Sequence, residues 1–158
     1  MKRFFAGLAL IAALALSGPS FATDYVQTLP SNFYMVPGDR LLDASGTPRW
    51  AFVFQYDGNL VLYRMPDVFG DPTAPENQPV ALWATGTNGQ SPVTLVMWPD
   101  GELILYAGYW AELWHATLNF GPMAGSTLKM STLGKLFIRS GSGSLHGGED
   151  NWVCPGSP

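Results

Sequence analysis

Several polar side chains that could bind a small polar ligand alternate along one short stretch of the chain. Gln55, Asp57, Asn59 and Tyr63 stand an even number of residues apart, so an extended chain places them on one face. Two amides, a carboxylate and a phenol on rigid strands can form a site for such a ligand. A solvated hairpin face with a turn-forming aspartate explains the same residues without a ligand, and spacing alone favours that interpretation.

A β-hairpin over residues 51–63 is expected to position these side chains. A three-residue loop, 56–58, sets Gln55 opposite Asn59 and closes a type I turn with a glycine at positive φ. A two-residue loop, 57–58, sets Gln55 opposite Leu60 and mixes the two faces, so face consistency favours the longer loop. The outer face then carries Gln55, Asn59, Val61 and Tyr63, and the inner face Phe52, Phe54, Leu60 and Leu62.

The hairpin pattern occurs three times in the sequence. Residues 93–98 and 102–106 flank a Pro-Asp-Gly turn, and a weaker copy joins 127–131 to 135–139. The same turn position is occupied in the three copies by Gly58, Gly101 and Gly134. One tryptophan follows each hairpin, namely Trp83, Trp114 and Trp152. Further short strands are expected at 32–36, 40–42, 81–87, 112–117 and 152–153.

Each hairpin unit alone has too little apolar surface to be stable in water. We therefore expect an all-β domain in which three sheets face inward and share one core with pseudo-threefold symmetry. The tryptophans are expected to pack near the common axis, where each buries a large area. The candidate core residues are Phe52, Phe54, Leu60, Leu62, Leu103, Leu105, Leu136 and Ile138.

The spacing Gln55-x-Asp57-x-Asn59-x-Val61-x-Tyr63 resembles, in all five positions, the mannose-binding motif of the bulb-type (monocot mannose-binding, B-lectin) lectins. The stretch 81–87 also resembles the segment that follows each motif in that family. The resemblance covers about residues 30–154 and implies a single lectin domain over 23–158. The implied fold is a β-prism II, with three four-stranded antiparallel sheets around a pseudo-threefold axis, in agreement with the repeat.

The resemblance implies a role for each motif residue at a bound mannose. Asp57 and Asn59 would bond the axial O2. Gln55 would hold O3, Tyr63 would hold O4, and Val61 would lie against the C3–C4 edge. The axial hydroxyl separates mannose from glucose, so polar groups aimed at it can discriminate between them. The implied function is non-catalytic binding of α-mannose-type glycans, and the full motif favours it over a merely solvated face.

The second and third units depart from the motif. The degenerate second site consists of Trp98, Asp100, Glu102, Ile104 and Tyr106, so an indole replaces the first amide and a carboxylate the second. We expect this site to be lost or altered, and Trp98 either packs within the fold or offers a sugar ring a stacking surface. The third unit has Ser131, Leu133, Lys135, Phe137 and Arg139 at these positions and is expected to be structural only.

Two other functions stay open on the sequence alone. A β-prism with degenerate sites can serve as a protein-interaction module, and the acidic, proline-rich segment 65–80 motivates this alternative. A lectin-like antibacterial toxin that docks on surface glycans would still need the Gln55 site.

Nothing in the sequence indicates catalysis, a cofactor or a metal. A glycosidase needs two carboxylates across a cleft, whereas the acid pairs here, 100/102 and 149/150, are typical of a polar surface. Neither histidine has a partner at metal-ligand spacing. We therefore expect a binding protein and no enzyme.

The first 22 residues are expected to be a signal peptide. A basic start and an apolar run from Phe4 to Leu16 precede Ser20-Phe21-Ala22, which resembles a small-x-small cleavage site. Cleavage after Ala22 starts the mature chain at Thr23. This predicts a secreted or periplasmic protein, and the design of the signal is typical of bacteria.

The charge of the mature chain bears on its partners. Once the two basic residues of the signal are removed, twelve acidic residues oppose six basic ones, for a net charge of −6. We therefore expect no nucleic-acid partner, no docking on anionic lipid and no membrane insertion. The single cysteine, Cys154, is either free or bridged between chains. The resemblance also implies that a homodimer can form by C-terminal strand exchange, with the Gly/Ser-rich segment 140–148 as the hinge.

Overall fold

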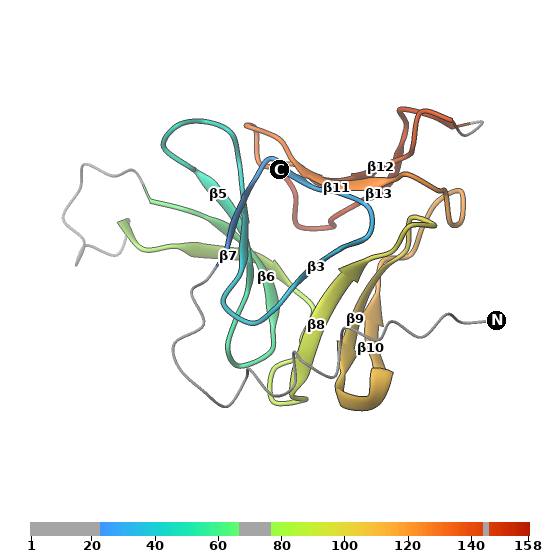
Figure 1. Ribbon diagram of the computed structural model, residues 1–158. Coiled ribbons are helices and arrows are strands. Elements are labelled where there is room, and N and C mark those ends of the chain that lie inside the picture. The colour runs from blue at the N-terminus through green and yellow to red at the C-terminus, as the bar shows by residue number, and fades with distance from the viewer. Residues whose placement is uncertain (1–22, 67–76, 144–145) are drawn as a thin grey trace.

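The computed structural model of the chain describes residues 23–66, 77–143 and 146–158. Within them, three β-sheets face one another around a common axis (Figure 1). The predicted signal peptide, and positions 67–76 of the predicted 65–80 loop, lie outside the described residues.

The three sheets are built from short strands. The first has the order β1 (Asp24–Val26), β4 (Arg40–Leu42), β5 (Trp50–Phe54), β6 (Leu60–Arg64) and β7 (Val80–Ala84). The second has the order β10 (Glu112–His115), β9 (Leu103–Ala107), β8 (Pro92–Met97) and β3 (Phe33–Met35). The third has the order β13 (Asp150–Val153), β12 (Leu136–Arg139), β11 (Thr127–Met130) and β2 (Thr28–Leu29).

The predicted arrangement of three four-stranded sheets is confirmed. Strand β1 adds a fifth strand to the first sheet and runs parallel to β4. A 3₁₀ segment, η2 (Gly108–Trp110), connects the paired strands β9 and β10 of the second sheet. No helix in the described part of the chain is long and apolar enough to cross a membrane.

The N-terminal region connects all three sheets. Strand β2 pairs with β11, β3 with β8, and β4 with β5, so three successive short strands enter three different sheets. The sequence predicted strands at 32–36 and 40–42 but not this distribution. Strands of two or three residues carry too little pattern to identify distant pairing partners.

The first hairpin has the predicted three-residue loop. Phe54 pairs with Leu60, and the backbone N–H of Gln55 donates to the carbonyl of Asn59 at 2.9 Å. The N–H of Gly58 donates back to the carbonyl of Gln55 at 3.0 Å, and Gly58 has a φ of +92°. The loop thus places Gln55 and Asn59 side by side, as expected from keeping polar and apolar residues on separate faces of the hairpin.

The turn glycines also allow each hairpin to approach the next unit. A Cβ on Gly58 would lie 2.2 Å from the Pro92 ring, and one on Gly134 would lie 2.5 Å from the Trp50 indole. A Cβ on Gly101 would lie 2.3 Å from the carbonyl oxygen of Met123. Each turn therefore packs against the start of the following unit, and the third packs back on the first. Glycine is needed here both for positive φ and for the missing side chain.

The core fills the space between the three sheets. All eight predicted core residues are fully buried, which confirms that prediction. Strands outside the hairpins add the fully buried residues Leu29, Met35 and Leu41. The first strands of the second and third hairpins add Leu95, Met97, Leu128 and Met130.

Three tryptophans, one from each unit, pack against one another at the centre. The ring centroids of Trp83, Trp114 and Trp152 lie 5.7 to 6.2 Å apart. The planes meet at 64° to 71°, so each indole presents its edge to the face of the next. The predicted packing of the tryptophans around the common axis is confirmed.

Candidate functional site

The outer face of the first sheet carries the predicted polar residues. Gln55 follows β5, and its side-chain Nε2 donates a hydrogen bond to the hydroxyl of Tyr63 on β6 at 2.8 Å. Both side chains are half-buried. Their mutual bond fixes the amide and the phenol beside each other, so a ligand meets positioned groups rather than mobile ones.

Asp57 stands at the exposed tip of the hairpin. Its Oδ1 accepts a hydrogen bond from the backbone N–H of Asn59 at 2.9 Å, which is an Asx turn. The interpretation of Asp57 as a turn-forming aspartate is therefore correct. The second carboxylate oxygen has no protein partner among the described residues and can accept a bond from a ligand.

Asn59 is held by the segment that follows β7. Its side-chain oxygen accepts hydrogen bonds from the Thr85 hydroxyl at 3.0 Å, the Gly86 N–H at 2.9 Å and the Thr87 N–H at 3.2 Å. Because the oxygen is fully engaged, the side-chain Nδ2 is left as the free donor of this amide.

The two threonines that hold Asn59 are themselves fixed. Their hydroxyl oxygens lie 2.8 Å apart, and Thr87 donates to the carbonyl of Gly58 at 2.9 Å. The backbone N–H of Leu60 donates to the Thr85 hydroxyl oxygen at 3.1 Å. The sequence analysis predicted this segment as a strand and noted its family resemblance. The role of Thr85 and Thr87 as supports of the site was missed, and their hydroxyls at alternate positions were the available signal.

Val61 lies on the same face but is only 3% exposed. It pairs with Val53 on one side and with Ala84 on the other, so neighbouring strands flank it on both sides. The resemblance implies that Val61 lies against the C3–C4 edge of a bound mannose, and the surface that Val61 actually offers a ligand is slight.

The motif residues lie on the outer face of the first sheet, apart from two cavities of the molecule. A cavity of about 320 Å³ lies elsewhere on the first sheet, where Trp50, Arg64 and Val80 are among its lining residues. A second cavity of about 200 Å³ lies beside Glu102 on the second sheet. None of the five motif residues lines either of them.

The outer face of the second sheet repeats part of this geometry with other residues. Trp98 Nε1 donates to the Tyr106 hydroxyl at 3.2 Å, and Asp100 Oδ1 accepts from the Glu102 N–H at 3.2 Å. The supports are different. The N–H of Ala116 bonds the Leu103 carbonyl just as that of Thr85 bonds the Leu60 carbonyl, so alanine stands in the place of a supporting threonine. Nothing equivalent to the threonine pair therefore holds residue 102.

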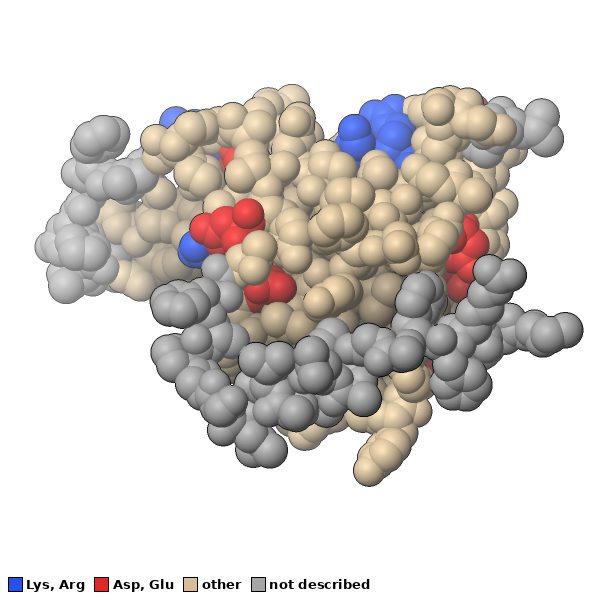
Figure 2. Space-filling model, in the orientation of Figure 1, with Lys and Arg blue, Asp and Glu red and all other residues tan. Residues whose placement is uncertain are grey.

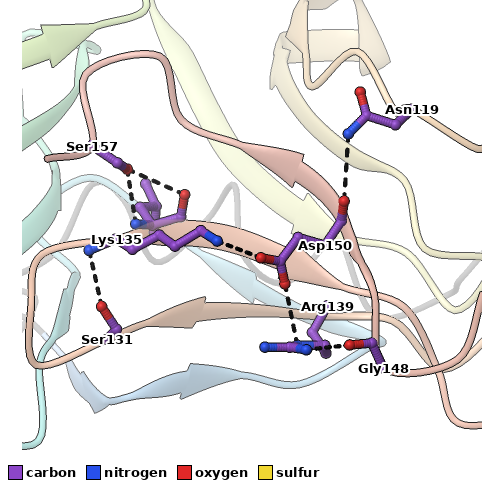
Figure 3. A network of polar contacts seen from close by, with 8 residues as sticks. Asn119, Ser131, Lys135, Arg139, Gly148, Asp150 and Ser157 are labelled. Atoms are coloured by element: carbon purple, nitrogen blue, oxygen red, sulfur yellow. Dashed lines mark hydrogen bonds and ion pairs between the residues drawn. The ribbon is translucent and has the colours of Figure 1, made fainter.

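The outer face of the third sheet is basic (Figure 2). Lys135 contacts Asp150, and Arg139 Nε lies 3.3 Å from Asp150 Oδ1 (Figure 3). The Lys135 and Arg139 cationic groups lie 5.2 and 5.1 Å from the centroid of the Phe137 ring. This network of ion pairs and cation–π contacts occupies the place that the motif takes on the first sheet.

Groups that could bind a metal are not gathered in the described chain. No three His, Cys, Asp or Glu residues of its described ranges lie close enough together to hold an ion. His115 and His146 each contact a glutamate three residues away in sequence, at 2.6 and 3.2 Å respectively.

Three β-sheets around a common axis are the β-prism II architecture of the bulb-type lectins. No family model matches the chain. Among curated proteins, the chain is similar to the B-type lectin plumieribetin of Scorpaena plumieri. The two are 28% identical over 123 residues, which cover 78% of this chain and 95% of the relative.

Solved structures give the same picture of the fold. The Japanese Marasmius oreades lectin superimposes with a TM-score of 0.63 at 24% identity, over 87% of this chain and 97% of that lectin. Monomeric mannose-binding lectins from the monocot Gastrodia elata superimpose with a TM-score of 0.60 at 24% identity, over 84% of this chain and 99% of that chain. The mannose-specific agglutinin of snowdrop (Galanthus nivalis) was solved with methyl-α-D-mannoside. It superimposes with a TM-score of 0.52 at 26% identity, over 77% of this chain and 99% of the agglutinin. By sequence and by fold, the chain is similar to B-type lectins.

Proposed function

We propose that this protein is a non-catalytic lectin that binds α-mannose-type glycans through one site on the first sheet. The site consists of Gln55, Asp57, Asn59, Val61 and Tyr63. The relatives that the chain resembles are lectins, and the snowdrop agglutinin was solved with a methyl mannoside.

The fixed orientation of Asn59 carries the proposal. Three donors engage its side-chain oxygen, so its Nδ2 can only donate outward, beside a free oxygen of Asp57. A sugar hydroxyl both donates and accepts, and this pair offers it one donor and one acceptor. Gln55 and Tyr63, bonded to each other at 2.8 Å, supply the next pair of polar groups along the strand.

The proposed site predicts weak binding of a single sugar. Roughly four hydrogen bonds at ~0.5–1.5 kcal/mol each must offset the entropy lost on association. Since Val61 is 3% exposed, apolar contact adds little. We expect a dissociation constant on the order of 1 mM, near −4 kcal/mol. Because each chain has one such site, tighter binding then requires two or more copies of the protein to engage one multivalent glycan.

A titration of the protein with methyl-α-mannoside, followed by NMR, tests the proposal. Shifts should be centred on Gln55, Asn59 and Tyr63, be weaker with the matching glucoside, and vanish in an Asp57→Ala/Asn59→Ala variant. Asp100→Ala is the matched control, because Asp100 holds the same turn position in the second hairpin.

The proposal fails if the mannoside causes no shifts at tens of millimolar, a concentration well above the expected constant. It also fails if the shifts persist in the double variant. Absence of sugar binding would direct attention to a protein partner for the same face.

A further inference from the structure

Three aromatic rings gather on the outer face of the second sheet. Trp98 and Tyr106 have centroids 6.3 Å apart, and Trp110 lies 6.2 Å from Trp98 and 5.3 Å from Tyr106. Trp98 and Tyr106 occupy the positions that Gln55 and Tyr63 hold on the first sheet. Trp110 comes from the segment η2, which joins β9 to β10.

The backbone holds Trp110 in an unfavourable conformation at the surface. Tyr109 and Trp110 have φ values of +59° and +62°, a left-handed region that bulky residues rarely adopt. Trp110 nevertheless remains 42% exposed, so the fold does not use this indole to fill its core. Strain that is kept at an exposed aromatic residue is a feature of functional sites.

Three carboxylates belong to the same part of the second sheet. Burial raises the pKa of Tyr106, and the negative charges of Glu112, Glu102 and Asp100 raise it further. Glu112 pairs with Tyr106 across β10 and β9, and Asp100 and Glu102 lie at the turn of the hairpin that carries Tyr106. A ligand that lies over the aromatic cluster meets hydrogen-bond acceptors at its edge.

We propose that this face is a second carbohydrate site that takes a gluco-configured pyranose, stacked on Trp110 and Trp98. An all-equatorial pyranose has C–H groups on both faces and hydroxyls around its rim. The C–H groups suit the electron-rich face of an indole, and the hydroxyls suit the three carboxylates. The proposal rests on the proposed sugar-binding function, since the face is the pseudo-threefold equivalent of the Gln55 site.

Mannose is disfavoured here for a structural reason. Glu102 replaces the donating asparagine amide, and alanine replaces the supporting Thr85 at position 116. The 200 Å³ cavity beside Glu102 takes the place of that support. The second sheet thus lacks the fixed donor that reads an axial hydroxyl and has an aromatic surface instead.

Titration of the ¹⁵N-labelled protein with cellobiose, followed through the indole N–H signals, tests this site. Signals of Trp98 and Trp110 should move, and Trp110→Ala should weaken binding at least about fivefold, as expected for the loss of one stacking surface. Tyr109→Ala is the matched control. Tyr109 is the adjacent, fully exposed aromatic residue, and no ring contact joins it to the cluster.

The outcomes separate this site from the first one. Asp57→Ala should leave cellobiose binding unchanged, and Trp110→Ala should leave mannoside shifts at Gln55 unchanged. The proposal is overturned if cellobiose moves neither indole signal, if Trp110→Ala binds it normally, or if methyl-α-mannoside binds at Trp110 equally well. If cellobiose binds but methyl-α-mannoside does not, only the function proposed for the first sheet is contradicted.

A separate observation concerns Asp39, a carboxylate that is 3% exposed. Its Oδ1 accepts a hydrogen bond from the backbone nitrogen of Thr23 at 2.7 Å, and its Oδ2 accepts from the Val36 N–H at 2.9 Å. The adjacent cation, Arg40, pairs instead with Asp24 at 2.7 Å. Within the described residues Asp39 is thus a buried charge without a cationic partner, which is normally unfavourable.

We infer that signal-peptide cleavage between Ala22 and Thr23 supplies the missing cation. Hydrolysis of this peptide bond by a signal peptidase adds water, leaving a carboxylate on Ala22 and an amine on Thr23. An α-amino group has an ordinary pKa near ~8, so it is protonated at neutral pH. The Thr23 nitrogen then forms an ion pair with Asp39 and fixes β1 beside β4.

Intact mass and denaturation test this second inference. Protein exported by a bacterial host should begin at Thr23. A two-residue Gly-Ser extension before Thr23 should lower the urea midpoint of the wild type, but not that of Asp39→Asn, which lacks the charge. A different N-terminus, or equal midpoints with and without the extension, would overturn it.

Discussion

The side-chain oxygen of Asn59 accepts a hydrogen bond from the hydroxyl of Thr85 at 3.0 Å. The two residues are separated by a long connection, and only the pairing of β6 with β7 brings them together. This contact orients the amide on which the proposed mannose site depends.

Thr85→Val should therefore weaken mannoside binding without a general loss of structure. Valine keeps the shape but removes the hydroxyl, so Asn59 loses one of its three fixed donors. One hydrogen bond is worth ~0.5–1.5 kcal/mol, so we expect an affinity loss of roughly two- to tenfold by NMR titration. Thr132→Val, at an exposed position in the third hairpin, should bind normally. Unaltered affinity in Thr85→Val would show that Asn59 is oriented without it.

Gly134→Ala should be among the most destabilising small substitutions. Its φ is +88°, and a Cβ would lie 2.5 Å from the Trp50 indole, so both conformation and contact oppose alanine. We expect a loss of at least about 2 kcal/mol in the free energy of unfolding, measured with urea. Gly148→Ala is the matched control, because Gly148 has a φ of +81° but open space around it. Equal losses in the two variants would contradict the packing argument.

Ionisation of Cys154 should make stability fall at alkaline pH. Burial raises the pKa of this thiol from 9.0 to about 11, with the Cys 1% exposed. The folded state therefore holds the proton more tightly than the unfolded state. The resulting stabilisation is complete below pH 9 and is lost as the pH rises through 11. Two pKa units correspond to roughly 3 kcal/mol at most. Urea midpoints between pH 8 and 11, compared with Cys154→Ala, measure the effect. A parallel decline in the variant would assign it to other groups.

The buried thiol also bears on the predicted homodimer. In this structure β13 pairs with β12 of its own chain, and the Cys154 N–H donates to the Leu136 carbonyl at 2.9 Å. Strand exchange could preserve these contacts between two chains, so the homodimer stays a prediction. A disulfide between chains needs an accessible sulfur, so we expect Cys154→Ser to leave the oligomeric state unchanged in size-exclusion chromatography. A shift from dimer to monomer in that variant would give the cysteine a role.

The arrangement of the residues of the proposed mannose site followed from the sequence because these residues are local. Gln55, Asp57, Asn59 and Tyr63 belong to one hairpin, and alternation and turn chemistry place them on one face. The supporting threonines and Trp110 were not recognised, because their contacts depend on how separate strands and the 3₁₀ segment meet. The slight exposure of Val61 likewise follows from strands that flank it on both sides.

By itself, the sequence determined the three hairpins, their inner and outer faces, the turn glycines and the shared core. These follow from periodicity and turn geometry, which act over a few residues. Only the tertiary structure decided which sheets receive β1 to β4, how each glycine packs against the next unit, and what surrounds Asp39 and Trp110. These depend on contacts between residues far apart in the chain, and such contacts leave no local pattern in the sequence.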